Sequence, residues 1–138
     1  MVFVMVDCEK IVNYLLMDGF LKVIIESNKD VVNIGRNIIS IFREEFGYSS
    51  VIDFGNHSDE DSVYDFDVKV KSYDDFLKVI DVAKELSTEK TKIHIDFIVG
   101  ERFVLSVIHK FNVSIEDIER CVYGKIIFSK VIYIFSIL

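Results

Sequence analysis

Three carboxylates in the middle of the chain have the types and spacing that could support metal chemistry. Asp65 and Asp67 stand two residues apart in an alternating segment, so on a strand their side chains share one face, about 7 Å apart. Asp96 lies in the next alternating segment and joins them if the two strands pair side by side. Converging carboxylates repel one another without a cation, and their oxygens suit Mg²⁺ or Mn²⁺, which can bind the phosphates of a nucleotide. The alternative is that these acids line the solvated face of a half-buried antiparallel sheet.

The segments around these acids alternate with the period of two that is typical of strands. Val63–Lys71 places apolar side chains on one face and acids and lysines on the other, and Thr91–Val99 alternates in the same way. A shorter strand is expected at Val51–Gly55. Lys125–Ile137 is rich in β-branched and aromatic residues, so we expect a closing strand there, with a helix as the alternative.

Apolar residues that recur every three or four positions predict five helices. Asp7 and Asp30 can cap the first two helices, and Ser72 and Ser114 open segments that have the spacing of a capping box. The expected helices are Cys8 to about Glu26, Asp30 to about Phe46, Ser72 to Leu86, Glu101 to about Phe111, and Ser114 to about Gly124.

The predicted order of elements is (β)ααββαβααβ, in which the strand before Asp7 is optional. This order predicts an α/β (α+β) sandwich, with a mixed sheet of about four strands and helices packed on at least one face. No stretch rich in Gly, Ser or Pro suggests a linker, and no internal repeat is found. Residues 1–138 are therefore expected to form a single domain.

The acidic charge of the chain is concentrated in one segment. The 138 residues include 23 Asp and Glu against 16 Lys and Arg, which gives a formal charge of −7. Six of the acids lie between Asp53 and Asp67 with no lysine or arginine among them, and the rest of the chain is nearly neutral. Proteins that coat nucleic acid or an anionic membrane by bulk charge are basic, so neither partner is expected, although a local basic patch could still bind nucleic acid.

The two cysteines, Cys8 and Cys121, match neither a disulfide framework nor a metal-binding spacing. We interpret both as buried thiols in a reducing compartment. The N-terminal residues lack the basic start of a secretory signal, and the apolar stretch Ile126–Leu138 is shorter than the ~20 residues that span a bilayer. These observations predict a cytoplasmic protein.

Three segments of the chain, VIDFG (51–55), DFDVKV (65–70) and KIHIDFIV (92–99), together resemble the minimal nucleotidyltransferase domains of the polymerase β superfamily. In that family a helix and a strand lead to a glycine–serine pair, then to D-x-D on the next strand, and then to a third Asp one helix later. The resemblance covers roughly residues 31–124.

The resemblance implies a role for several residues. Asp65, Asp67 and Asp96 would hold a catalytic Mg²⁺ or Mn²⁺, and Gly55 would lie beside the nucleotide. Asn56 stands where the family has serine, and an acidic segment follows where the phosphate-binding start of a helix is usual, so an inactive relative is an alternative. A helical partner protein is also implied, since minimal nucleotidyltransferases commonly work with one.

A second enzymatic interpretation uses Asp53, Asp67 and Lys69. These residues resemble the PD-(D/E)xK nuclease pattern, in which two carboxylates bind Mg²⁺ and a lysine on the same strand face positions the attacking water. On a strand, Asp67 and Lys69 share a face, as that chemistry requires.

A third interpretation is not enzymatic. The last predicted strand is strongly apolar, and a bare edge strand of this kind is an aggregation hazard that a second copy of the chain could cover. On this interpretation the protein is a homodimer or another homo-oligomer, and the acidic segment between Asp53 and Asp67 is a solvated loop or a docking surface for a basic partner.

Overall fold

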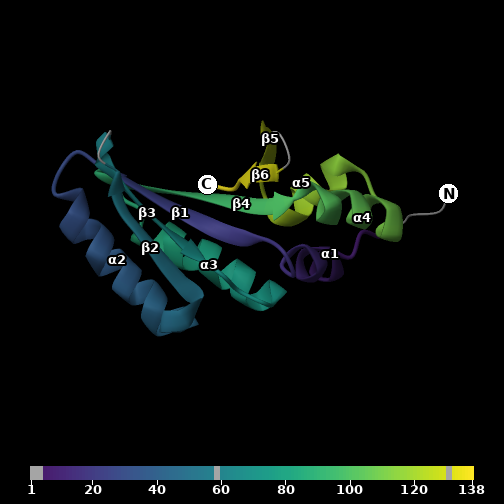
Figure 1. Cartoon of the computed structure of the whole chain (residues 1–138), viewed down its shortest axis with the longest axis horizontal. Coiled ribbons are helices and arrows are strands. Elements are labelled where there is room, and N and C mark those ends of the chain that lie inside the picture. The colour runs from purple at the N-terminus through teal and green to yellow at the C-terminus, as the bar shows by residue number, and fades with distance from the viewer. Residues whose placement is uncertain (1–4, 58–59, 130–131) are drawn as a thin grey trace.

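The computed structural model describes residues 5–57, 60–129 and 132–138. Within these residues, five α-helices, one short 3-10 helix and six strands follow one another along the chain (Figure 1). In chain order they are α1 (Cys8–Leu15), β1 (Phe20–Ser27), α2 (Val31–Phe46), η1 (Tyr48–Ser50), β2 (Val51–His57), β3 (Glu60–Val68), α3 (Tyr73–Leu86), β4 (Thr91–Gly100), α4 (Glu101–Phe111), α5 (Ile115–Val122), β5 (Lys125–Ser129) and β6 (Ile132–Ser136).

The strands form one sheet in the order β2-β3-β1-β4-β6-β5, and every neighbouring pair is antiparallel. From β1 to β4 the elements follow the β-α-β-β-α-β order of the split βαβ, or ferredoxin-like, motif. The predicted packing of helices on a sheet is confirmed. The predicted mixed sheet of about four strands is wrong, because β1 and the last hairpin supply strands that the sequence interpretation did not count.

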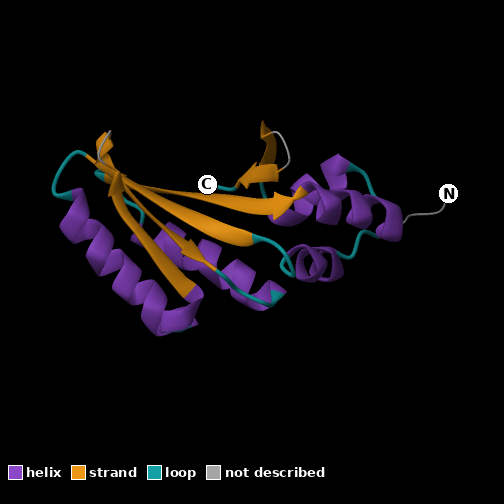
Figure 2. Ribbon diagram, viewed as in Figure 1, coloured by secondary structure: helices purple, strands orange, loops and turns teal. Residues whose placement is uncertain are grey.

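One face of the sheet is buried beneath helices. Figure 2 shows α2 and α3 together on one side of the strands, while α1, α4 and α5 gather at one end. The buried face is built from alternate residues of the central strands, namely Leu21, Val23, Ile25, Tyr64, Phe66, Val68, Ile93, Ile95, Phe97 and Val99. The residues between them point to the other side, which we call the open face.

The first predicted helix, Cys8–Glu26, is wrong in its second half. The helix α1 ends at Leu15, whose carbonyl accepts a hydrogen bond from the backbone N–H of Gly19, and the chain then enters β1. A Cβ atom at Gly19 would lie 2.6 Å from the Phe97 ring, so this turn lies too close to β4 for any other residue. The residues that were expected to form one long apolar helix are therefore a helix followed by a central strand.

The predicted closing strand Lys125–Ile137 is also wrong in detail, because it is a hairpin. The strands β5 and β6 pair antiparallel, with Ile127 opposite Ile134, and β6 alone joins the hairpin to β4. Residues 130–131 lie outside the described residues. The optional strand before Asp7 falls largely on residues 1–4, which are also outside them.

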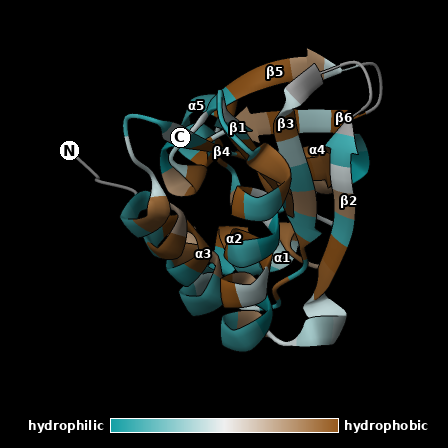
Figure 3. Cartoon of the chain, turned by 90° about the vertical axis from the view of Figure 1, so that its left-hand side faces the viewer, coloured by the Kyte–Doolittle hydropathy of each residue, from teal (hydrophilic) through white to brown (hydrophobic). Residues whose placement is uncertain are grey.

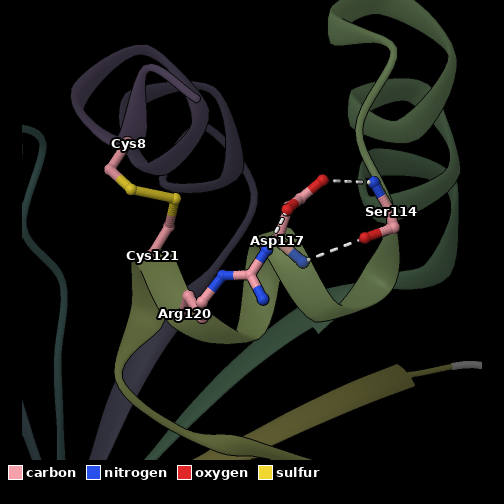
Figure 4. Close-up of polar contacts among 5 residues, drawn as sticks. All are labelled: Cys8, Ser114, Asp117, Arg120 and Cys121. Atoms are coloured by element: carbon pink, nitrogen blue, oxygen red, sulfur yellow. Dashed lines mark hydrogen bonds and ion pairs between the residues drawn. A yellow bond between two sulfur atoms is a disulfide. The ribbon is translucent and has the colours of Figure 1, made fainter. Parts of the chain in front are cut away.

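The four predicted N-caps are confirmed, because each side chain accepts a hydrogen bond from the backbone N–H three residues later: Asp7, Asp30, Ser72 and Ser114. The Asp30 carboxylate accepts a hydrogen bond from the backbone N–H of Asn33, and the Ser114 and Asp117 side chains form a reciprocal capping box at the start of α5. Arg120, one turn later, forms an ion pair with Asp117 (Figure 4).

Cys8 and Cys121 form a disulfide that ties the start of α1 to α5 (Figure 4). The prediction of two buried thiols is therefore wrong, because helix packing brings together two residues that are 113 positions apart in sequence. The cytoplasmic location stays a prediction. Free thiols no longer support it, because both cysteines form a disulfide and disulfides persist mainly in oxidising compartments. No described helix combines the length and the apolar character that crossing a bilayer would need.

Candidate functional site

The predicted metal ligands lie on two strands that are not neighbours. Asp65 and Asp67 both belong to the open face of β3, but β1 lies between β3 and β4. The condition under which Asp96 would join the pair, that its strand lies directly beside the strand of Asp67, is therefore not met. Two interstrand spacings separate the backbones of Asp67 and Asp96 by about 10 Å.

Lys22 of β1 occupies the position between these acids. It is opposite Asp67 in the β1–β3 register and opposite Asp96 in the β1–β4 register. Its Nζ lies 2.9 Å from Oδ1 of Asp67 and 4.6 Å from the centre of the Phe54 ring. The chain thus supplies its own cation at the acidic cluster, and sequence reasoning missed this residue because it assigned Lys22 to a helix.

The two carboxylates of β3 differ in their surroundings. Asp65 is buried, with 7% of its surface exposed, and lies beside Asp67 on the same face. Burial raises the pKa of the Asp67 carboxyl above its ordinary value, Lys22 opposes this rise, and the Asp65 carboxylate adds to it. The ionised form of Asp67 therefore depends on Lys22 for its stability.

Asp96 has a hydrogen-bond partner on β6, the strand on the other side of β4 from β1. Its Oδ1 accepts a hydrogen bond of 2.7 Å from Oγ of Ser136, its cross-strand neighbour on β6. The row across the open face is then Asp67, Lys22, Asp96 and Ser136. In this row each acid has a partner on the adjacent strand, which is how polar groups on a half-buried sheet face are usually satisfied.

Gly55 and Asn56 lie at an irregularity of β2. Gly55 has a φ of +70° and is opposite Asp65 in the register, and a Cβ atom built on it would meet open space. Its backbone N–H donates to Oδ1 of Asp53 over 2.8 Å, and Nδ2 of Asn56 donates to the Val63 carbonyl over 3.0 Å. A side chain at Gly55 would therefore meet open space, whereas the Asn56 side chain braces the β2–β3 hairpin.

The structure brings together only part of the predicted ligand set. Among residues 5–57, 60–129 and 132–138, no three His, Cys, Asp or Glu side chains lie close enough to hold one metal ion. Asp65 and Asp67 remain as a pair of carboxylates on one strand face. Two carboxylates can hold Mg²⁺ only if water or phosphate oxygens complete its six ligands.

The residues of the nuclease interpretation lie apart. Asp53 is opposite Phe66 and therefore on the helix-covered face, where its Oδ2 accepts a hydrogen bond of 2.7 Å from the Tyr64 hydroxyl. Burial and the adjacent Asp53 raise the pKa of Tyr64 to about 12, so this hydroxyl stays a donor at neutral pH. Asp67 is on the opposite face of the sheet.

Lys69, the third residue of that interpretation, has a structural role in the fold. Its Nζ donates to the carbonyl oxygens of Leu16 and Gly19, just beyond the end of α1. A cation at this position satisfies carbonyls that the helix leaves without partners and suits the negative end of the helix dipole.

Comparisons of the chain with protein-family models, with curated proteins and with solved structures find no match.

Proposed function

We propose that this protein is a non-enzymatic interaction module that forms a homodimer through β5. A single observation carries the proposal: β5 is an edge strand, and it is apolar and exposed. Within the described part of the chain it pairs with β6 on one side only, and 81% of Phe128 and 51% of Ile127 are exposed. Figure 3 shows β5 mainly in hydrophobic colours at the rim of the sheet.

The other edge of the sheet, β2, has features that discourage pairing. Its register with β3 shifts at two places, between Asp53 and Gly55 and between Asn56 and His57. Such irregularities and inward charges are common means by which soluble proteins protect an edge strand. The described part of β5 has a continuous register with β6 and one charged residue, Lys125. The contrast favours β5 as the edge that a partner covers.

The backbone hydrogen bonds define which groups of β5 face outward. The N–H of Ile126 points away from β6, because it donates to the Glu119 carboxylate of α5 over 3.0 Å. By the alternation of an antiparallel strand, the N–H and C=O of Phe128 face the same way. Two copies related by a two-fold axis at Phe128 can exchange these groups in a pair of hydrogen bonds, and each Ile126 keeps its bond to Glu119. The interface is then isologous, as in most homodimers.

Phe128→Lys tests this proposal by placing a charge at the centre of the expected interface. In sedimentation equilibrium the wild-type chain should have twice the monomer mass. The dissociation constant of the variant dimer should be at least about tenfold higher than that of wild type, because lysines that face each other across the interface repel. Ile52→Lys is the matched control, because it adds the same charge to an exposed apolar position of β2 and should leave the dimer intact.

Two results would contradict the proposal. One is a wild-type chain that stays monomeric up to roughly millimolar concentration, where even weak specific pairs associate. The other is a dimer that Ile52→Lys dissociates and Phe128→Lys does not, because this would place the interface at β2.

Metal-dependent nucleotide binding is the second candidate function, and one observation favours it. The buried Asp65 and the half-buried Asp67 lie two residues apart on one face of β3, which places two carboxylates side by side. In this proposal Asp65 and Asp67 bind Mg²⁺ or Mn²⁺, and the nucleotide phosphates and water supply the remaining ligands. The proposal extends to nucleotidyl transfer only if such a complex forms.

Thermal unfolding with Mn²⁺, with and without ATP, tests this second function. A ligand that binds only the folded chain raises its melting temperature by mass action. Wild type should be stabilised and Asp67→Ala should not respond. Asp96→Ala should still respond, because β1 separates Asp96 from the pair. The absence of any response in wild type, or an equal response in Asp67→Ala, would rule out metal binding at this pair.

A further inference from the structure

A pocket of about 370 Å³ lies at the end of the sheet where the β1–α2 turn meets the α3–β4 turn. It is lined by three lysines, two acids, a serine and an asparagine, namely Lys29, Lys90, Lys92, Glu26, Glu89, Ser27 and Asn28. This volume falls in the range of pockets that hold small molecules. Three lysines against two acids give this lining a net positive charge in a chain whose net charge is −7.

The three lysines have no acidic partner within 4.0 Å among the described residues. Glu26 is opposite Lys92 in the β1–β4 register, but its Oε2 lies 3.6 Å from Nε2 of His94 instead. Glu26 therefore lines the pocket, but its carboxylate lies closer to His94 than to the three lysines. The ammonium groups of Lys29, Lys90 and Lys92 are available to a ligand.

A buried hydroxyl completes the pocket. Ser27 is 3% exposed, and its Oγ accepts a hydrogen bond of 3.3 Å from the backbone N–H of Lys29. Because Oγ acts there as an acceptor, its own hydrogen remains for a ligand oxygen. The opposite turn is fixed by hydrogen bonds between Thr88 and Thr91, so Lys90 projects from a braced loop.

We propose that this pocket binds a phosphate group, either as inorganic phosphate or as part of a small phosphorylated molecule. A phosphate dianion offers several acceptor oxygens, which match three ammonium donors and one hydroxyl donor. Glu26 and Glu89 lower the positive potential of the pocket and therefore weaken the binding of every anion, including phosphate. This binding site is independent of β5 and of the Asp65 and Asp67 pair, because other elements form it.

Calorimetric titration with inorganic phosphate tests the proposal, with sodium chloride at equal ionic strength as the reference. Replacing both Lys90 and Lys92 by glutamine should weaken phosphate binding at least about tenfold, because two charge-assisted hydrogen bonds are lost. Lys84→Gln removes an exposed lysine of α3 that does not line the pocket, and it should bind like wild type.

Glu89→Gln gives a test of opposite sign, since removal of a negative charge from the rim should tighten phosphate binding several-fold. Phosphate and inorganic pyrophosphate are titrated separately, and tighter pyrophosphate binding would identify a phosphorylated molecule as the ligand class. The proposal is overturned if phosphate produces no more heat than chloride, or if the Lys90→Gln/Lys92→Gln variant binds as tightly as wild type.

Discussion

Reduction of the disulfide between Cys8 and Cys121 is expected to lower the melting temperature by about 10 °C. A crosslink between residues 113 positions apart closes nearly the whole chain into a loop. The chain-entropy model predicts that such a loop stabilises the folded state by about 5 kcal/mol, because it restricts the unfolded chain. Measured values are typically about 2–4 kcal/mol, and each kcal/mol shifts the melting temperature of a domain of this size by about 3–4 °C. Calorimetry with and without a dithiol reductant measures the shift.

The double variant Cys8→Ala/Cys121→Ala is the control for this experiment. It should melt near the temperature of the reduced wild type and should not respond to reductant. Cys121 is buried, so part of the stability that the double variant loses comes from the smaller alanine side chain. The change in the wild-type melting temperature on adding reductant measures the contribution of the disulfide alone. Two titratable thiols per chain without reductant, and one melting temperature under both conditions, would contradict the disulfide.

Lys22→Met is expected to lower the free energy of unfolding at neutral pH by about 1–3 kcal/mol. Methionine retains the apolar stem of the lysine, so the change mainly removes the charge that lies 2.9 Å from Asp67. Asp67 would then be ionised and largely buried beside Asp65, without its cation. Urea unfolding of wild type and variant measures the difference.

The loss caused by Lys22→Met should depend on pH. The pKa of Asp67 is raised in the folded state, chiefly by burial, so its contribution to stability is greatest at low pH and is lost as the pH rises through the folded-state pKa. Removal of Lys22 raises that pKa further and extends the loss to higher pH. The variant should therefore approach wild type well below about pH 4, where Asp is protonated in the unfolded chain as well, and be less stable than wild type at neutral pH.

Two further variants sharpen this test. Lys22→Met/Asp67→Asn removes both charges and should recover most of the stability that Lys22→Met loses at neutral pH. Lys78→Met breaks an exposed ion pair with Glu45 and should change stability little, because solvent screens such pairs. A loss that is equal at all pH values, or that Asp67→Asn does not relieve, would show that packing of the lysine stem is responsible.

The elements that sequence reasoning predicted well are those with a clear cap and a regular apolar stripe. The helix opened by Asp30 and the alternating strand around Asp96 are confirmed, because local hydrogen bonds and a single buried face determine both. β1 was missed because Ile24, on its open face, is as apolar as the residues of its buried face. Alternation then disappears, and a dense apolar segment also satisfies the period of a helix.

The candidate site shows the same limit of local patterns. The shared face of Asp65 and Asp67 follows from their spacing, but the distance from Asp67 to Asp96 depends on strand order, which no local pattern encodes. Once β1 was assigned to a helix, its place between the two acidic strands could not be foreseen. The partner of the acids, Lys22, was lost with it.

The disulfide divides the molecule into a closed ring and a tail. The ring runs from Cys8 to Cys121 and includes β1 to β4, whereas β5 and β6 lie in the tail. The ring gains stability because its unfolded state is restricted, but the tail gains nothing from this restriction and depends on the pairing of β6 with β4. Local opening should therefore begin at the hairpin, so the strand proposed to bind a second copy can adjust its position while the ring stays folded.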